Sequence, residues 1–166
     1  STTVVDQTDT EAFAAAMKPA TRLVMVETPV NPTCAITDIA AVVALAHRHG
    51  ALVACDNTFA SPVNQQPLLL GADLVVQSAT KFLGGHGTAI AGAIVDGGTF
   101  DFSSNDKFPM FTEPDPSYHG LQFWPALGAG SYIIKARVQL LRDMGAAISP
   151  FNSFLFLQGL ETLSLR

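Results

Sequence analysis

Charged residues are scarce in this sequence. Only 14% of the 166 residues are Asp, Glu, Lys or Arg and 48% are hydrophobic, whereas about 25% of the residues in an ordinary soluble domain are charged. So few charges cannot cover the whole surface of a free-standing domain. We therefore expect another domain or another protomer to cover part of this chain, or the chain to be a piece of a longer protein.

Long apolar runs and basic clusters are also lacking. No uncharged stretch is an apolar run of about 18 residues, so the sequence predicts no membrane span. The first nine residues have neither the basic start nor the apolar block of a signal peptide. The net charge is −5 and comes without a run of basic residues, which argues against a nucleic-acid partner.

The cysteines and glycines exclude several common kinds of site. Cys34 and Cys55 form no C-x-x-C pair, and with the four histidines they show no zinc spacing. Cys55 lies in an apolar run, where we expect a buried thiol, and this usage of cysteine favours a reduced, cytoplasmic setting. Gly87 and Gly92 have the spacing of a P-loop, but the Lys-Ser/Thr that must follow is absent. No G-x-G-x-x-G opens a helix after a strand.

The apolar runs that are present alternate with helical patterns. Strands are predicted at residues 4–5, 23–26, 52–55, 73–77 and 89–95. Helices are predicted from the capping box of Thr8 and Glu11, after Thr37, at residues 66–70, at 132–144 and from Ser149 onward. The last of these is apolar nearly all round, so we expect it to be buried. Alternating strands and helices predict an α/β fold with a mostly parallel sheet and helices on both faces.

Polar residues follow three successive predicted strands at equal spacing. Asn31, Asp56 and Lys81 are each 25 positions apart. The carboxyl ends of parallel strands meet at one edge of a sheet, and α/β folds bind ligands at that edge. The sequence therefore predicts a site at which an amide, a carboxylate and an amine come together.

These residue types suit pyridoxal 5'-phosphate (PLP). A lysine at a strand edge can form a Schiff base with a carbonyl, and a carboxylate such as Asp56 can keep the pyridine nitrogen protonated, which makes the ring an electron sink. Ser78 and Thr80 lie three and one residues before Lys81 and can donate to the phosphate. Asn31 can donate to the ring hydroxyl. Each residue alone has a simpler explanation, since a lone Asp after a strand is commonly a turn residue and a lone Lys is commonly a solvated charge. The combination carries the hypothesis.

Four sequence strings resemble the Cys/Met-metabolism family of PLP-dependent enzymes. They are Glu-Thr-Pro-Val-Asn-Pro at 27–32, Asp-Asn-Thr-Phe-Ala-Ser-Pro at 56–62, Gly-Ala-Asp-Leu-Val-Val-Gln-Ser-Ala-Thr-Lys at 71–81 and Gly-Gly-His-Gly at 84–87. The resemblance covers essentially the whole chain and implies the aspartate-aminotransferase-like fold of type I. It implies Lys81 as Schiff-base lysine and general base, Asp56 as pyridinium partner, Ser78 and Thr80 as phosphate ligands, and Asn31 near the 3-hydroxyl.

Within this family the chain shows two resemblances. The long loop at 108–120 and the segments 135–145 and 149–166 look most like O-acetylhomoserine sulfhydrylases. Residues 27–87 look closer to cystathionine γ-synthases and lyases. We give the loop more weight because loops near a site set substrate choice. The resemblance then implies γ-replacement on O-acetylhomoserine, an amino-acid substrate, by sulfide or a thiol to give homocysteine or methionine.

Three alternatives stay open. The same cofactor-binding residues would support γ-elimination, as in methionine γ-lyase, or cystathionine synthesis. A non-catalytic fragment or structural subunit would keep the fold without turnover. A nucleotide-binding α/β module would bind nucleotide and show no visible absorbance.

The resemblance also implies the setting of this chain. We expect residues 1–166 to be the central part of the PLP-binding large domain, with the N-terminal segment and the C-terminal small domain absent. We expect this segment alone to be inactive. The family relation further implies a homotetramer, a dimer of dimers, with the site at a protomer interface.

Overall fold

The computed structural model describes residues 1–166. The chain divides into two compact units, residues 1–95 with 148–166 and residues 96–147. The first unit carries the sheet and every predicted site residue. No helix in either unit is long and apolar enough to cross a membrane.

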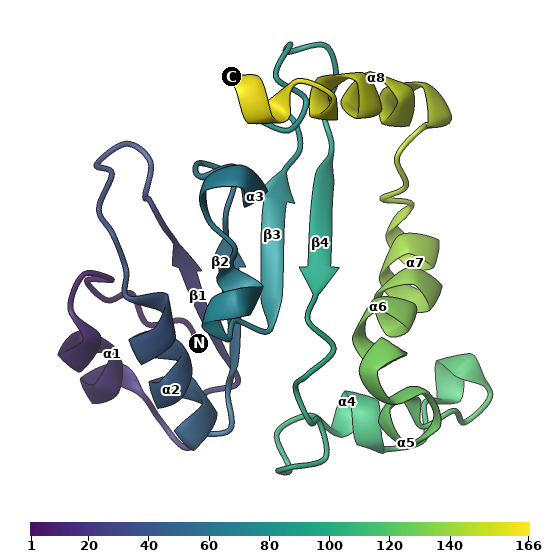
Figure 1. The fold of residues 1–166 in the computed structure, drawn as a ribbon. Coiled ribbons are helices and arrows are strands. Elements are labelled where there is room, and N and C mark those ends of the chain that lie inside the picture. Colours follow the sequence, from purple (N-terminus) through teal and green to yellow (C-terminus); the bar gives the residue numbers. More distant parts are fainter. The chain divides into compact units, whose positions relative to one another are not determined.

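The sheet of the first unit has four strands in chain order. They are β1 (Leu23–Glu27), β2 (Leu52–Asp56), β3 (Leu74–Ser78) and β4 (Gly92–Asp96). The first three pair in parallel, and β4 runs in the opposite direction beside β3 (Figure 1). The mostly parallel sheet predicted from the sequence is therefore confirmed. Residues 4–5 form no strand, and β4 begins three residues later than expected.

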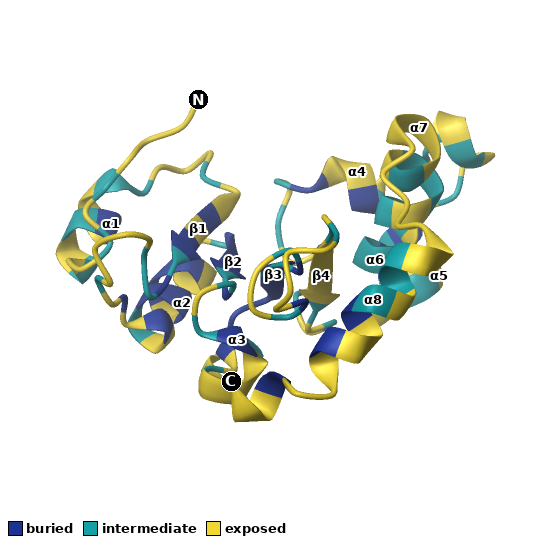
Figure 2. Cartoon of the chain, turned by 90° about the horizontal axis from the view of Figure 1, so that it is seen from above, coloured by how far each residue is buried: buried dark blue, intermediate teal, exposed yellow.

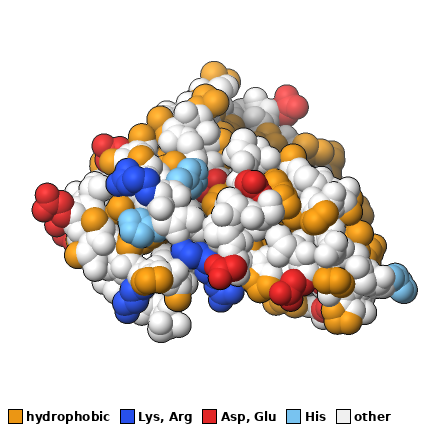
Figure 3. Space-filling view, turned by 90° about the horizontal axis from the view of Figure 1, so that it is seen from below, with side chains coloured by type: hydrophobic (Ala, Val, Ile, Leu, Met, Phe, Trp, Pro, Cys, Tyr) orange, Lys and Arg blue, Asp and Glu red, His pale blue; other side chains and the backbone are white.

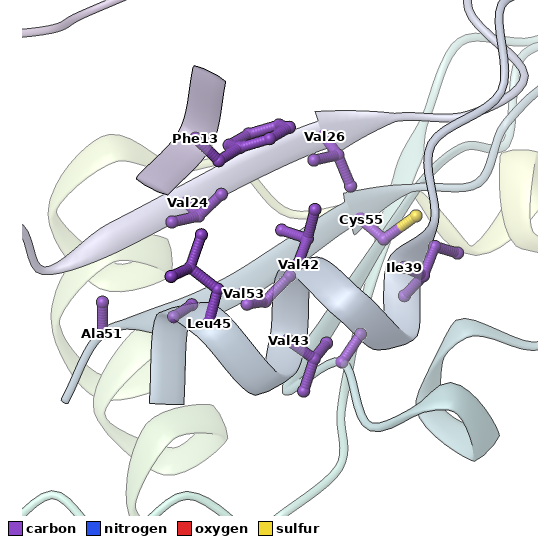
Figure 4. Close-up of a cluster of buried hydrophobic side chains, with 12 residues drawn as sticks. Phe13, Val24, Val26, Ile39, Val42, Val43, Leu45, Ala51, Val53 and Cys55 are labelled. Atoms are coloured by element: carbon purple, nitrogen blue, oxygen red, sulfur yellow. The ribbon is translucent and has the colours of Figure 1, made fainter. Parts of the chain in front are cut away.

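Helices α1 (Thr10–Ala16) and α2 (Ile39–Arg48) pack on one face of β1 and β2. Figure 4 shows Val24 and Val26 of β1 and Val53 of β2 facing Val42 of α2 in the main hydrophobic cluster, in which Val26, Val42 and Val53 are all but inaccessible to solvent. This hydrophobic cluster packs α1 and α2 against the sheet. On the opposite face of β1, Leu23 and Met25 are exposed.

The predicted caps of α1 and α2 are each one residue too early. Asp9 caps α1, because the Thr8 hydroxyl donates to Asp6 instead and the Asp9 carboxylate accepts from the Glu11 N–H. Asp38 caps α2 by accepting from the Ala41 N–H. Thr37 is buried and its N–H donates to the Thr28 hydroxyl.

Two short helices connect β2 to β3. The first, α3 (Ser61–Asn64), lies where a loop was predicted, and the second is the 3-10 helix Pro67–Leu70. Gly71 ends the second helix with a φ of 95°, which L side chains rarely adopt.

Helix α8 (Pro150–Leu160) closes the first unit and is followed by the 3-10 turn Leu163–Leu165. Ser149 caps it by accepting from the Asn152 N–H, as its sequence indicated. The expectation that α8 is buried was wrong. Phe156 and Gly159 are buried, but its apolar residues are largely solvent-facing in this chain (Figure 2): Phe151, Phe154, Leu157 and Leu160.

The second unit is helical and its aromatic side chains form its core. Its elements are α4 (Pro109–Thr112), the 3-10 turns Pro116–Tyr118 and Gly128–Gly130, α5 (Phe123–Leu127), α6 (Ser131–Lys135), a π-helix (Ala136–Leu141) and α7 (Arg142–Met144). The helix predicted at 132–144 is thus present, with a π-helical middle, and ends at Gly145.

An ion pair fastens the long loop of the second unit. Lys135 Nζ lies 2.7 Å from Asp115 Oδ2 and 4.2 Å from the centre of the Phe123 ring. Hydrogen bonds from Lys135 and then Ser117 hold the pKa of Asp115 well below its usual range. The loop at 108–120 is therefore held by a contact within the second unit, to Lys135 at the end of α6.

Candidate functional site

The carboxyl ends of three strands meet at one edge of the sheet. The register places Glu27 beside Asp56 and Asp56 beside Val76, so β1 and β2 end at the same level and β3 ends two residues further on, at Ser78. Lys81 follows the end of β3 by three residues and Asn31 follows the end of β1 by four. Of the three residues predicted at strand ends, only Asp56 ends its strand, and Asn31 and Lys81 lie in the loops that follow β1 and β3.

Asp56 and Ser78 are tied together by a residue that sequence reasoning overlooked. The half-buried Asp56 carboxylate accepts a hydrogen bond of 2.9 Å from the Thr58 N–H. The Thr58 hydroxyl accepts a bond of 2.7 Å from the Ser78 N–H. Thr58 therefore fixes the end of β2 to the end of β3. The Asp-x-Thr spacing typical of an Asx-turn was the available signal.

Lys81 is exposed on a tight turn that leaves β3. Its N–H donates to the Ser78 carbonyl at 3.1 Å, and its carbonyl accepts from the Gly85 N–H at 2.7 Å. The backbone of Lys81 is held while its amine is left at the surface of the sheet edge. This is the presentation that an amine needs in order to react with a carbonyl compound.

Thr80 lies between β3 and the start of β4. Its hydroxyl donates to the Ala91 carbonyl at 3.2 Å and accepts from the Ala91 N–H at 3.1 Å. Because a hydroxyl can rotate, Thr80 can keep the bond from the N–H and turn its single proton to another acceptor. Ser78 and Thr80 are both half-buried.

Asn31 is less closely tied to the others. It is exposed, and its N–H donates to the Glu27 carboxylate at 3.3 Å. The structure shows no hydrogen bond between Asn31 and the other four predicted residues. It places Asp56, Ser78, Thr80 and Lys81 on two adjacent strand ends, with Asn31 on a loop beyond the third.

A buried amide network supports the loops behind this edge. Asn57 Nδ2 donates to the Gln65 carbonyl at 2.8 Å, and Gln65 Nε2 donates to Asn57 Oδ1 and to the Thr28 carbonyl at 2.8 and 2.7 Å. These bonds join the loop after β1 to the segment after β2. Next to Asp56, burial and then the neighbouring carboxylate raise the pKa of the Cys55 thiol to about 11, so this thiol is a neutral core group.

Open α/β proteins bind their ligands at the carboxyl edge of the sheet. This chain presents a lysine, a carboxylate and hydroxyls at that edge, so its fold and site define it as a protein of this ligand-binding class. Comparison with known proteins narrows the class. The model of the family described as Cys/Met metabolism PLP-dependent enzyme matches residues 1–166, and the chain belongs to this family.

Several relatives cover nearly all of this chain. It is 53% identical over 98% of its length to an O-acetyl-L-homoserine sulfhydrylase of Leptospira meyeri, and 46% identical over 98% to a homocysteine/cysteine synthase of Saccharomyces cerevisiae. A crystal structure of a protein described as an O-acetylhomoserine (thiol)-lyase from Campylobacter jejuni matches with a TM-score of 0.92 and 36% identity over 98% of this chain. That structure contains N'-pyridoxyl-lysine-5'-monophosphate.

The chain spans less than half the length of these proteins. It corresponds to 38% of the Leptospira relative, 37% of the yeast relative and 40% of the Campylobacter chain.

Proposed function

We propose that the protein carrying this chain is a PLP-dependent enzyme that converts O-acetylhomoserine and sulfide to homocysteine and acetate. The observation that carries the proposal is the presence of Asp56 at the end of β2 and of Lys81 just after the end of the adjacent parallel strand β3, in a chain 53% identical to an O-acetyl-L-homoserine sulfhydrylase. In the reaction the bond from the γ-carbon to the acetate oxygen breaks and a bond from the γ-carbon to sulfur forms.

The residues of this edge fit PLP by their chemistry. Lys81 offers an exposed amine for the cofactor's aldehyde, and Asp56 offers a half-buried carboxylate that the Thr58 N–H orients. Ser78 and Thr80, three and one residues before Lys81, offer hydroxyl donors for a phosphate. Asn31 is assigned to the ring hydroxyl by the family resemblance.

Each residue then has a role at a stated atom. When bound, PLP supplies an electron sink for bonds at the α-carbon of an amino acid. Asp56 would hold a proton on the pyridine nitrogen. The Lys81 amine, once free, would accept and return protons at the substrate's carbon atoms.

Replacing Asp56 by Asn tests the assignment of charge. Asp56→Asn keeps the size of the side chain and an oxygen for the Thr58 N–H, but loses the negative charge. We expect turnover to fall by about 100-fold or more, the size typical of losing a positioned proton-holding group. Asp143→Asn is the matched control, because Asp143 is an exposed carboxylate paired with its neighbour Arg142. Unchanged turnover in Asp56→Asn would contradict the assignment.

Product analysis with and without sulfide tests the reaction. We expect homocysteine only when sulfide is present. Formation of a keto acid and ammonia without sulfide would instead support γ-elimination, and complete lack of turnover would support a non-catalytic role.

We also propose that the protein works as a homotetramer in the cytoplasm. The many exposed apolar side chains support a covered surface in the assembly, among them Leu23 and Met25 on β1 and Phe154 and Leu157 on α8. On the face seen in Figure 3, apolar side chains are spread widely among the charged ones. The free cysteines Cys34 and Cys55 suit a reducing compartment. Light scattering of the purified protein tests the oligomeric state.

A further inference from the structure

The loop that follows Lys81 is held from behind by the C-terminal part of the chain. Figure 1 shows α8 lying across the connection between β3 and β4. At this crossing Gly159 of α8 packs on Gly84: a Cβ at Gly159 would clash with the Gly84 carbonyl oxygen and stand 2.7 Å from the Leu83 carbonyl oxygen, closer than such atoms can approach. A Cβ at Gly84 would stand 2.8 Å from the Phe156 ring.

One guanidinium group completes this contact. Arg166 Nη1 donates to the Phe82 carbonyl at 2.7 Å. Its Nη2 lies 3.4 Å from the Leu83 carbonyl oxygen and also contacts the Gly159 carbonyl oxygen. Its Nε donates to the Thr162 hydroxyl at 2.9 Å, which orients the group. Arg166 thus joins the loop after Lys81 to the last turn of α8.

Lys81 therefore lies between two anchored neighbours. On one side Thr80 is bonded to Ala91 through both its backbone and its hydroxyl. On the other side the carbonyl of Phe82 is bonded to Arg166. A charged donor with a planar fork holds carbonyl groups more firmly than a neutral donor does.

We propose that Arg166 is a positioning residue that fixes the backbone of Lys81 and so the place of the lysine amine at the sheet edge. The inference rests on the proposed function, because it concerns the lysine assigned to hold PLP. It adds a residue 85 positions away in the sequence, from a segment to which sequence reasoning assigned no part in the site.

The test compares Arg166→Ala, Arg166→Lys and the control Arg142→Ala in the full-length protein. Arg142 is an exposed arginine whose guanidinium pairs with the adjacent Asp143. Three quantities are measured for each: the Kd for PLP, the visible circular dichroism per bound PLP at saturation, and the Tm of the PLP-free protein. The dichroism reports how firmly the bound cofactor is held, and a loss of general stability does not change it at saturation below the Tm.

We expect Arg166→Ala to raise the Kd for PLP by about tenfold, the size typical of losing hydrogen bonds to a charged group, and to reduce the visible dichroism. Arg166→Lys keeps the charge and one donor, so it should restore part of both. Arg142→Ala should match the wild type. A lowered Tm with Kd within twofold of wild type and unchanged dichroism would overturn the inference and leave Arg166 a structural clamp.

If Arg166→Ala fails to fold, Arg166→Lys decides. A weaker Kd and a smaller dichroism at an unchanged Tm support the inference, and wild-type values for both contradict it. Failure of the wild type to bind PLP would be a different result, since it would refute the proposed function and this inference with it.

Discussion

Because Gly159 contacts the loop after Lys81, we predict that Gly159→Ala destabilises the protein, although Ala ordinarily stabilises a helix relative to Gly. Within a helix, Ala is favoured over Gly by about 1 kcal/mol, so Gly159→Ala in α8 would normally stabilise. In this structure the added methyl would clash with the Gly84 carbonyl oxygen and would also meet the Leu83 carbonyl oxygen at 2.7 Å, against 3.4 Å for an ordinary contact. The helix and the loop must therefore separate by more than the roughly 0.7 Å that the Leu83 contact alone requires.

The obstacle is backbone on both sides, so no side chain can rotate to make room. Overpacking of this kind costs about 1–3 kcal/mol, and separation also strains the bonds of Arg166 to Phe82 and Leu83. Because two backbone carbonyl oxygens are in the way, we take the upper part of this range, about 2–3 kcal/mol. After subtracting about 1 kcal/mol for helix propensity, we expect Gly159→Ala to lower the free energy of unfolding by about 1–2 kcal/mol.

Urea unfolding of the full-length protein measures this change. Gly130→Ala is the matched control: Gly130 has a φ of −85°, and its Cβ would stand an ordinary 3.4 Å from Ile134, so the change should be nearly neutral. A Gly159→Ala variant that is as stable as the wild type or more stable would refute the close approach of α8 to the lysine loop.

Two further predictions concern the neighbourhood of Asp56. Thr58→Val removes the acceptor of the Ser78 N–H and should lower the free energy of unfolding by about 1–3 kcal/mol. Thr58→Ser keeps the hydroxyl and should be as stable as the wild type. Equal stability of the two variants in urea would contradict the role of the hydroxyl. Because burial raises the pKa of Cys55 to about 11, its thiol stays protonated at pH 8 and only a thiolate is alkylated readily. We expect iodoacetamide followed by peptide mapping to label exposed Cys34 and to reach Cys55 only after unfolding, and early labelling of Cys55 in the folded protein would count against its burial.

The sheet and its polar edge could be predicted because their signals are local. The apolar runs that form β1 to β3 end within one residue of the predicted positions, and the spacing of Asn31, Asp56 and Lys81 follows from one strand-helix-strand repeat after another. The cap of α1 was mispredicted for a local reason as well, because two adjacent residues can each cap the helix. Thr8 and Asp9 are both good caps, and only the bond from Thr8 to Asp6 decides between them.

The parts that could not be predicted depend on contacts between distant segments. Thr58 bonds to Ser78, 20 positions away, and Arg166 bonds to Phe82, 84 positions away. Neither residue type signals such a partner by itself. The burial of α8 was predicted from composition alone, but composition does not say which surface covers a helix, and in this chain most of its apolar face is exposed.

The central claim is that Lys81 holds PLP. It is tested most directly by borohydride reduction of the purified full-length protein, followed by intact mass and peptide mapping. Reduction makes a lysine–cofactor linkage permanent. We predict a pyridoxyl phosphate adduct on the peptide that contains Lys81 and its loss in Lys81→Ala. An unmodified Lys81 in protein saturated with PLP, or an adduct on another lysine, would contradict the account.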